Sequence, residues 1–407
     1  FASEQARQRP GLREKPFSCY NPSMRFLAFP GSSPALSSAE AIAQLPAAGW
    51  RKVGPMFGAD DLPANALDTL AGCTKIATVL FSTPTETLAA GQLADWVEAN
   101  PRGSGKLVFG LTWLGSSFKR RRFALELKEA LKRLGRSVRW FEGEGGVSPA
   151  AVAQVGLIND GYDFTVVEDG PTAWVAVTHA VQNADRWTEL DMGRPRRNAK
   201  NGMTPPKLAS LLVHLAGTPA SLLDPFCGSG TLLSAASMAG VGQVFGSDIS
   251  ADLIEDAREN LAWAEDRGLL PGTADIQLAV ADATEPLPLP AGSIASIVTE
   301  GYLGHPLRGQ EPVSLLEGEA RDVQQLWERA LPHLREALAD DGILIATWPS
   351  YRTSQGQARV DLPTMRLEKF GFSREPFALI GGANVPDLLY VRPEQFVGRR
   401  IVKLRKA

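Results

Sequence analysis

The chain has 407 residues, 44% of them hydrophobic and 21% charged, which allows two or three globular domains with a substantial core. It holds no apolar run near the roughly 20 residues of a membrane span, and its net charge of −3 does not by itself indicate nucleic-acid binding. The three cysteines are far apart and the four histidines are scattered, which argues against a disulfide framework, a zinc cluster or another metal site. This cysteine usage predicts a reducing, cytoplasmic setting.

The first half of the chain predicts a mixed α/β region. Residues 1–23 combine Arg, Glu, Pro and Ser without an apolar stretch, so we expect a flexible lead-in rather than a signal peptide. Ser37 and Ser38 are N-cap candidates for the first helix, and Asp169-Gly170-Pro171 is the expected turn of a hairpin. The predicted strands cover 24–29, 73–82, 137–143 and the two arms of 163–181, and the predicted helices cover 38–45, 117–134 and 149–158.

The second half of the chain predicts a more regular alternation of strands and helices. A Pro-, Arg- and Gly-rich stretch, 191–206, has no apolar periodicity and is expected to be a linker or a functional loop. Predicted strands then follow at 221–224, 242–248, 275–282, 293–300 and 342–348, with helices at 230–239, 250–265 and 321–338. Such β-α-β order indicates a mainly parallel, doubly wound sheet. The β-rich end of the chain is expected to close the sheet edge.

Basic residues concentrate in two clusters despite the acidic net charge. One is Lys119-Arg120-Arg121-Arg122, on a predicted helix, and the other contains Arg194, Arg196, Arg197 and Lys200. This asymmetry suits a protein that meets phosphate groups on one face. The alternative is a pair of solvated helix faces.

The stretch "LLDPFCGSGT" predicts a ligand site, because a buried strand ends in Asp224 and a glycine loop opens a helix. A dinucleotide or S-adenosylmethionine could use such a loop. The loop lacks the G-x-G-x-x-G and Walker A patterns, and a carboxylate suits a sulfonium and an ammonium better than a pyrophosphate. Asp248 and Asp282 end the next two strands, where ligands gather in such sheets. A lone aspartate there would more often cap a helix, and a dehydrogenase remains a weaker alternative.

These motifs resemble one known family. "DPFCGSGT", preceded by "GRPRRNAKNGMTPPKLA", is similar to the THUMP-domain tRNA guanine-N2 methyltransferases and their bacterial relatives. "MRFLAFPGSSPALSSAEAIAQL" and "ELKEALKRLGRSVRWFEGEGGVSPAAVAQVGL" resemble their ferredoxin-like and THUMP regions. The resemblance covers about residues 24–405. It implies a lead-in over 1–23, a ferredoxin-like plus THUMP RNA-binding region over 24–185, a linker and cofactor-proximal loop over 186–206, and a Rossmann-like methyltransferase domain over 207–407.

The resemblance also implies the ligands. S-adenosylmethionine would be held by Thr204, Asp224, Pro225, Phe226, Cys227, Gly228, Ser229, Gly230, Thr231, Asp248, Ile249, Asp282 and Ala283. A tRNA would meet the THUMP region and the two basic clusters, Lys119, Arg120, Arg121, Arg122, Arg194, Arg196, Arg197 and Lys200. Some relatives need a small zinc-binding activator subunit, and nothing in this sequence shows whether this protein does.

The expected catalytic motif departs from the family pattern. Relatives carry Asp/Asn-Pro-Pro-Tyr/Phe at the tip of the fourth strand, whereas this chain has Thr299-Glu300-Gly301-Tyr302-Leu303. Without a gap Leu303 takes the aromatic position, and with a one-residue deletion Tyr302 takes it. Our hypothesis is that Glu300 accepts a hydrogen bond from the target amine, with Gly301 in place of proline and Tyr302 stacking on the base. The alternatives are a DNA or rRNA amino-methyltransferase and an inactive relative that still binds RNA.

Overall fold

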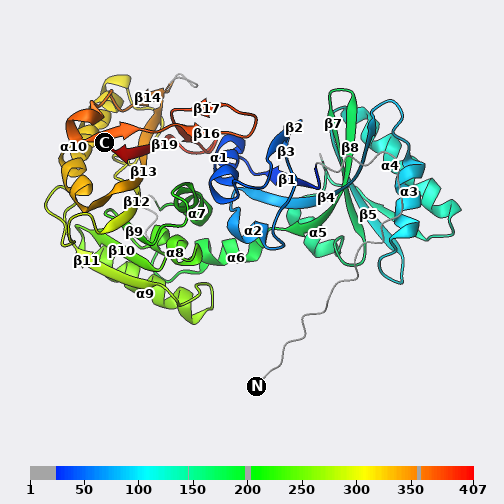
Figure 1. The fold of residues 1–407 in the computed structure, drawn as a ribbon, viewed down its shortest axis with the longest axis horizontal. Helices are drawn as coiled ribbons and strands as arrows, with labels where there is room; N and C mark the ends of the chain where they lie inside the picture. Colours follow the sequence, from blue (N-terminus) through cyan, green and yellow to red (C-terminus); the bar gives the residue numbers. More distant parts are fainter. Residues whose placement is uncertain (1–23, 145, 198–202, 355–358) are drawn as a thin grey trace. The chain divides into compact units, whose positions relative to one another are not determined.

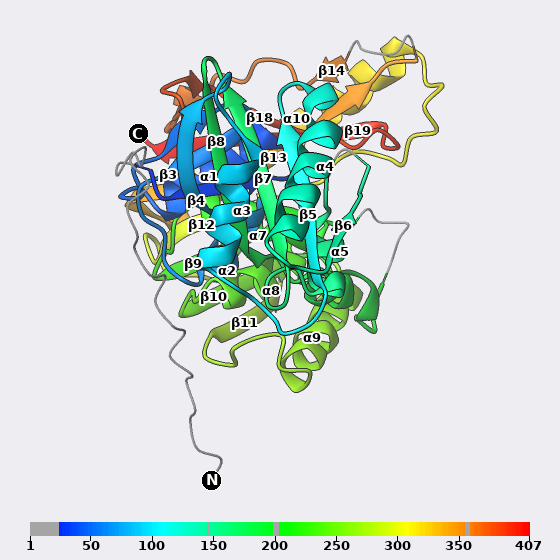
Figure 2. The same cartoon turned by 90° about the vertical axis from the view of Figure 1, so that its right-hand side faces the viewer.

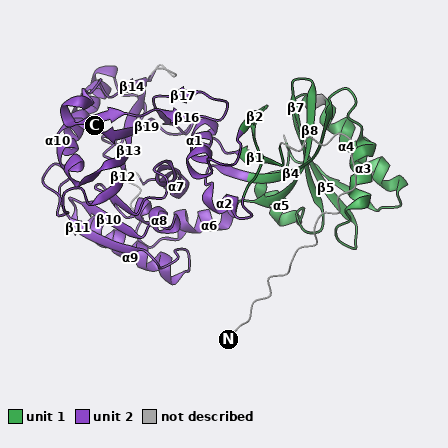
Figure 3. Ribbon diagram, in the orientation of Figure 1, with its two compact units in different colours: residues 1–29, 51–62, 75–182 green, residues 30–50, 63–74, 183–407 purple. Residues whose placement is uncertain are grey.

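The computed structural model describes residues 24–144, 146–197, 203–354 and 359–407, so the predicted lead-in lies outside the described residues. The chain forms two compact units (Figure 3). Unit 1 holds the described residues up to Phe29 together with 51–62 and 75–182. Unit 2 holds residues 30–50 and 63–74 and the described residues from Asn183 onward. Two segments before residue 75 therefore pack within unit 2, although the sequence analysis grouped them with the rest of 24–185.

Unit 1 is built on an eight-stranded sheet with the order β2-β3-β1-β4-β8-β7-β5-β6. Its strands are β1 Phe26–Pro30, β2 Arg51–Val53, β3 Met56–Ala59, β4 Cys73–Pro84, β5 Leu107–Leu114, β6 Val138–Phe141, β7 Tyr162–Asp169 and β8 Thr172–Val181. Its helices are α3 Ala90–Ala99, α4 Ser117–Arg133 and α5 Pro149–Val155. The predicted hairpin is confirmed as β7–β8, and Gly170 turns it at a φ of 57°.

The two long helices of unit 1 cover one face of its sheet. Figure 2 shows α3 and α4 side by side in front of β5 and β7. Trp96 of α3 and Leu127 of α4 pack there against Phe109 and Phe164 of the strands. A smaller cluster around Val152 of α5 is separate from this core. This packing leaves the polar side of α4, with its run of basic residues, at the surface.

Unit 2 is built on a nine-stranded sheet whose main path is β11-β10-β9-β12-β13-β19-β15 (Figure 1). Its strands are β9 Ser221–Asp224, β10 Gln243–Asp248, β11 Asp275–Val280, β12 Ile294–Glu300, β13 Leu338–Arg352, β14 Arg359–Asp361, β15 Phe372–Arg374, β18 Leu388–Tyr390 and β19 Val397–Lys406, with β16 Phe377–Ala378 and β17 Asn384–Val385 as a separate pair. Strands β9 to β13 are parallel, and β19 runs antiparallel to β13. The predicted doubly wound sheet is confirmed.

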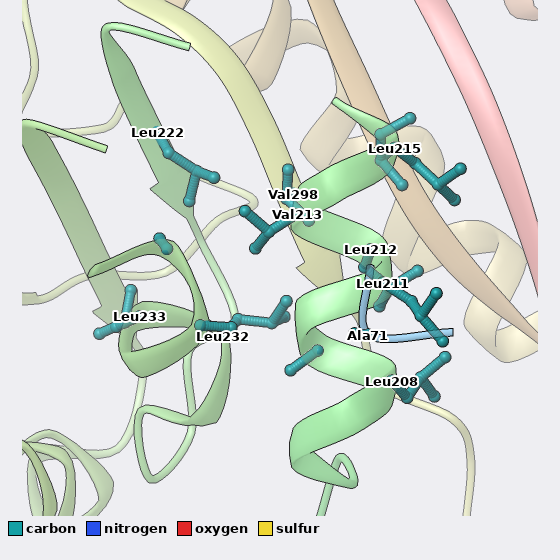
Figure 4. Close-up of a cluster of buried hydrophobic side chains, with 14 of the residues drawn as sticks. Ala71, Leu208, Leu211, Leu212, Val213, Leu215, Leu222, Leu232, Leu233 and Val298 are labelled. Atoms are coloured by element: carbon teal, nitrogen blue, oxygen red, sulfur yellow. The ribbon is translucent and has the colours of Figure 1, made fainter. Parts of the chain in front are cut away.

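Helices lie on both faces of this sheet because successive strand residues point to opposite sides. Figure 4 shows Leu222 of β9 and Val298 of β12 facing α7 (Pro206–Leu215) and α8 (Thr231–Met238). The neighbouring Leu223 and Ile297 belong instead to the cluster around Trp327 of α10 (Val313–Ala337). The helices of the unit are α1 Pro34–Gln44, α2 Ala66–Thr69, α6 Ala184–Thr188, α7 Pro206–Leu215, α8 Thr231–Met238, α9 Ala251–Asp266 and α10 Val313–Ala337, with a π-helical turn at Glu189–Gly193 and a 3₁₀ turn at Leu367–Phe370.

Two helices begin well before their predicted starts. Helix α1 begins at Pro34 after Ser33, so Ser37 and Ser38 are interior residues and not the N-cap. Proline fits the first turn because that turn leaves its backbone N–H groups unused. Helix α10 begins at Val313, eight residues before the predicted start, with exposed Val313 and Leu315 in its first turn. Within the parts of the chain that the structure describes, no helix is both long and apolar enough to cross a membrane.

Candidate active site

Three acidic strand ends meet at one edge of the unit 2 sheet. Asp224 ends β9, Asp248 ends β10 on one side of it, and Glu300 ends β12 on the other. The chain passes from β9 outward to β11 and then crosses back to β12, so this edge is the switch point at which such sheets bind ligands. A cavity of about 810 Å³ opens there. Its walls include Thr204, Asp224, Phe226, Cys227, Gly228, Ser229, Thr231, Asp248, Ile249, Glu300, Gly301 and Tyr302.

Most of the predicted cofactor residues therefore line one cavity. Pro225, Gly230, Asp282 and Ala283 do not belong to its described lining. Asp282 accepts hydrogen bonds at 2.8 Å from both the backbone N–H and the hydroxyl of Thr284, which lower the pKa of its carboxyl. Ala283 is buried. The predicted third strand end is thus wrong: β11 ends at Val280, and Asp282 belongs to a locally hydrogen-bonded turn after it.

The glycine loop is held by the acids on either side of it. Asp224 Oδ1 accepts hydrogen bonds from the Thr299 hydroxyl at 2.6 Å and from the Phe226 backbone N–H at 3.2 Å. The Gly228 N–H donates to Asp248 Oδ2 at 3.0 Å, and Gly228 has a φ of 50°, which favours glycine. The loop backbone is therefore fixed at the cavity wall with no side chain at Gly228.

Burial and nearby negative charge raise the pKa values of two groups at this edge of the sheet. Burial, together with the nearby carboxylates of Asp248 and Glu300, raises the pKa of Asp224 to about 7. Burial likewise raises the pKa of the Cys227 thiol, so that thiol is not a nucleophile. A cation bound beside Asp224 would relieve this crowding, whereas a phosphate would add to it. The carboxylates at this edge therefore favour a positively charged ligand over a phosphate.

The wall beside the glycine loop combines an acceptor with an apolar surface. Asp248 accepts backbone hydrogen bonds from Gly228 and Ser250, both at 3.0 Å, and a carboxylate retains further lone pairs for hydroxyl donors. The next residue, Ile249, is 69% exposed although it is large and apolar. An exposed isoleucine beside a carboxylate suits the flat ring and ribose of a nucleoside.

Glu300 occupies the predicted catalytic position with both carboxylate oxygens already hydrogen-bonded. Oε2 accepts from the Thr204 hydroxyl, and Oε1 forms an ion pair with Nε of Arg399 on β19. The Glu300 side chain is 7% exposed and that of Arg399 is 5% exposed. Arg399 could not be found from the sequence, because it lies almost one hundred residues away on an antiparallel strand and belongs to no motif.

The structure explains why glycine stands in the expected proline position at 301. A Cβ added to Gly301 would lie 2.5 Å from the indole ring of Trp327, which is fully buried under the strand end. The following loop is held by Tyr351, whose hydroxyl donates to the Leu303 carbonyl at 3.0 Å, and by Glu319, which pairs with His305 at 2.9 Å. Packing and hydrogen bonds thus restrain this loop where relatives use two prolines.

Tyr302 is the aromatic side chain that this motif presents to the cavity. Its ring is 45% exposed and makes an edge contact with His305, with 6.1 Å between the ring centres. Leu303 also lines the cavity, but it has no ring. Of the two alignments that the sequence left open, the one with Tyr302 in the aromatic position suits a base-binding site better.

The predicted RNA contacts have different environments. Lys119 pairs with Glu168 and Arg122 with Glu126, Arg120 donates to the Gly143 carbonyl, and Arg121 is exposed on the same helix. Arg196 pairs with Glu259 through two 2.6 Å hydrogen bonds, and Arg197 is exposed, while Lys200 lies outside the described residues.

Arg194 differs from the other members of its cluster. It is only 6% exposed and donates to the Thr231 hydroxyl at 2.6 Å. The expectation that it contacts RNA does not fit this burial, because a phosphate cannot approach a guanidinium inside the protein. Among the described residues no group of His, Cys, Asp and Glu side chains could hold a metal ion.

Comparison with known proteins shows which families this domain resembles. Residues 194–355 match the RMKL-like methyltransferase domain family. The tRNA (guanine(10)-N2)-dimethyltransferase of Methanothermobacter thermautotrophicus is 29% identical over 181 residues, which are 44% of this chain and 45% of that protein. The enzyme of the same name from Pyrococcus abyssi is 29% identical over 147 residues, which are 36% of this chain and 39% of that protein.

A solved structure extends the likeness in fold. TrmN from Thermus thermophilus superimposes with a TM-score of 0.53 and 19% identity, covering 94% of this chain and 100% of TrmN. The α/β fold and the resemblance to guanine-N2 methyltransferases are thus confirmed, and residues 194–355 match a methyltransferase domain family. The chain spans less than half the length of the curated relatives that it matches.

Proposed function

We propose that this protein transfers a methyl group from S-adenosylmethionine to the exocyclic N2 amine of a guanine in tRNA. The observation that carries the proposal is the cavity in which the glycine loop, Asp248 and Glu300 come together. These three features lie in the segment that matches a methyltransferase domain family. The cavity gives the methyl donor and the acceptor base one shared site.

The residues that line the cavity fit the cofactor. S-adenosylmethionine supplies an electrophilic methyl group on a sulfonium, and it carries an ammonium but no phosphate. Asp224, with its pKa raised by burial and by neighbouring acids, favours a cation in this part of the cavity. Asp248 offers acceptors for ribose hydroxyls, and Ile249 offers an apolar surface for the adenine. Thr204 and the glycine loop would border the amino-acid end.

Glu300 and the loop after it would act on the acceptor amine. The lone pair of this nitrogen is delocalised into the ring, and acceptors on its N–H groups favour a pyramidal nitrogen that can attack. Glu300 would accept from one N–H while Tyr302 stacks on the extruded base. The new N–C bond forms as the S–C bond breaks, and the nitrogen then gives a proton to water.

The carboxylate of Glu300 favours guanine over adenine. Guanine presents N1–H beside its N2 amine, so both neighbouring groups donate to a carboxylate. Adenine presents N1, an acceptor, beside its N6 amine, and a carboxylate only accepts. The names of the two curated relatives agree with this assignment. We therefore favour guanine as the target base.

The RNA would be bound by unit 1 as a THUMP-like region and by exposed basic residues. Lys119, Arg121 and Arg122 on α4 and Arg197 in unit 2 are exposed cations of the two clusters. They would contact phosphates and read shape rather than sequence. We place the reaction in the cytoplasm, where tRNA is modified and where the thiols of Cys73 and Cys227 stay reduced.

Methyl-labelled S-adenosylmethionine tests the proposal. The protein is incubated in parallel with unmodified tRNA, with rRNA and with DNA, and the label in each pool is counted. We expect label in tRNA. Label found only in DNA or only in rRNA would show that this nucleic acid, and not tRNA, is the substrate. If no pool is labelled although the protein binds S-adenosylhomocysteine, the result would favour an inactive RNA-binding relative.

A further inference from the structure

Arg399 lies beside the proposed catalytic carboxylate, and no sequence motif points to it. We propose that Arg399 is a positioning residue, which holds the Glu300 carboxylate in the orientation that receives the target amine. The inference rests on the proposed function. Arg399 lines the cavity together with Glu300, and its Nε donates to Glu300 Oε1.

The ion pair crosses one whole strand of the sheet. Glu300 ends β12 opposite Thr347 of β13, and Arg399 of β19 lies opposite Pro349 on the other side of β13. Two strand spacings amount to about 10 Å between backbones, so only long side chains can meet above β13. The extra methylene of glutamate, relative to the aspartate of relatives, gives Glu300 the reach to make this contact.

The pair also balances the charge of the site. Glu300 shares its edge of the sheet with Asp224 and Asp248, and its side chain is almost fully buried. A buried carboxylate without a counter-charge is unfavourable, and removing one partner of such a pair is strongly destabilising. Arg399 thus makes it possible to place a third acid beside a cavity that already contains two.

The contacts leave room for the substrate. A carboxylate has about four lone-pair positions, of which Arg399 and Thr204 use one on each oxygen. The remaining positions can accept the N–H groups of a guanine edge. Arg399 is itself held by Gln395, whose Oε1 accepts from Nη1 at 3.2 Å. The acceptor is therefore fixed from two sides, by Thr204 and by Arg399, before the base arrives.

The next residue in the strand provides a matched control. Arg400 also forms ion pairs, with Asp361 at 2.6 Å and with Asp387 at 2.7 Å. Neighbouring strand residues point to opposite faces, and Arg400 is not part of the described cavity lining. Arg400→Met therefore removes an arginine and its ion pairs from the same strand without touching the site.

The test is a double-mutant cycle in the full-length chain. Wild type, Glu300→Gln, Arg399→Met and the double variant are compared for kcat and KM with unmodified tRNA, together with Arg399→Lys and Arg400→Met. Binding of S-adenosylhomocysteine and thermal melting report whether each variant is folded. The double variant removes both charges, so it leaves no unpaired buried ion even if Arg399→Met alone is unstable.

We expect Arg399→Met to lower kcat about 100-fold, as misplacement of a reacting group does, with KM for tRNA changed less than about threefold. Adding Arg399→Met to Glu300→Gln should change kcat by less than about threefold, because residues that act through one another are not additive. Arg399→Lys should recover part of kcat, and Arg400→Met should lower only the melting temperature.

Equal losses from Arg399→Met in both backgrounds, or a loss confined to KM, would overturn the positioning role while leaving the proposed function intact. An equal loss of kcat in Arg400→Met would also overturn it, because any arginine of β19 would then do the same. A wild-type protein that binds S-adenosylhomocysteine but methylates no tRNA would instead contradict the proposed function itself.

Discussion

Glu300 is longer by one methylene than the aspartate or asparagine of related motifs, and the structure uses that length to reach Arg399. We therefore predict that Glu300→Asp, although it keeps the carboxylate, lowers kcat by about 10- to 100-fold through misplacement of the acceptor. The affinity of this variant for S-adenosylhomocysteine should stay within about twofold of the wild-type value, since Glu300 is proposed to contact the target base and not the cofactor. Steady-state kinetics and calorimetry measure both quantities, and an Asp variant as active as wild type would show that the reach to Arg399 is irrelevant.

Asp224 makes a separate prediction about stability. Its pKa is raised from an ordinary value of 3.8 to about 7 in the folded protein, so the folded state holds the proton more tightly than the unfolded state. The protonated Asp224 therefore contributes to the free energy of unfolding. This contribution, about 4 kcal/mol, is fully present below about pH 4 and is lost as the pH rises through about 7. Asp224→Asn abolishes this loss.

The melting temperature of Asp224→Asn should therefore exceed that of wild type by several degrees more at pH 8 than at pH 5. The same variant should bind S-adenosylmethionine more weakly, because the carboxylate that favours its cationic groups is gone. Thermal melts at the two pH values measure the first effect. A difference that is the same at pH 5 and pH 8 would mean that Asp224 does not carry the shifted pKa.

Helix α4 is the element on which RNA binding is most directly testable. Reversing two exposed charges, Arg121→Glu with Arg122→Glu, should weaken tRNA binding and reduce the slope of log K against log salt by about two. Binding of S-adenosylhomocysteine should not change. Arg258→Glu with Arg267→Glu, in and just after α9, changes the net charge equally and is the control. Equal weakening by both pairs would indicate only a general charge effect.

At the scale of elements, the sequence predicted what local patterns determine. Strand β9 has the predicted bounds, the hairpin β7–β8 turns where expected, and the alternation of unit 2 gives a parallel sheet. The first turns of α10 were missed because exposed Val313 and Leu315 interrupt the amphipathic pattern. The Arg399–Glu300 pair could not be predicted, since it depends on the register of β13 with β19, which brings distant residues together.

At the scale of the molecule, unit 2 is not a continuous stretch of sequence. Leu36 and Ala39 of α1 belong to the same buried cluster as Leu208 of α7. Glu40 accepts hydrogen bonds from the backbone N–H groups of Ala71 and Gly72 and pairs with His214 of α7 at 2.6 Å. Unit 2 thus includes a helix, α1, that precedes α7 by more than one hundred residues in the sequence.

Deleting residues 1–182 should therefore destabilise the rest of unit 2 rather than release it intact, because α7 loses its packing partner α1. We expect a lower melting temperature and increased binding of a hydrophobic dye compared with the full-length chain. A truncated protein with the melting temperature and S-adenosylhomocysteine affinity of the full-length chain would show that α1 is dispensable for this unit.

We propose that the protein methylates the N2 amine of guanine in tRNA, in the cavity at the end of β12. The most direct test is to incubate the full-length protein with unmodified tRNA and S-adenosylmethionine, digest the RNA, and identify the modified nucleoside by mass spectrometry, with Glu300→Gln as the control. We predict N2-methylated guanosine, strongly reduced in the Glu300→Gln sample. Methylation on an adenine, or equal guanosine methylation by both proteins, would contradict this account.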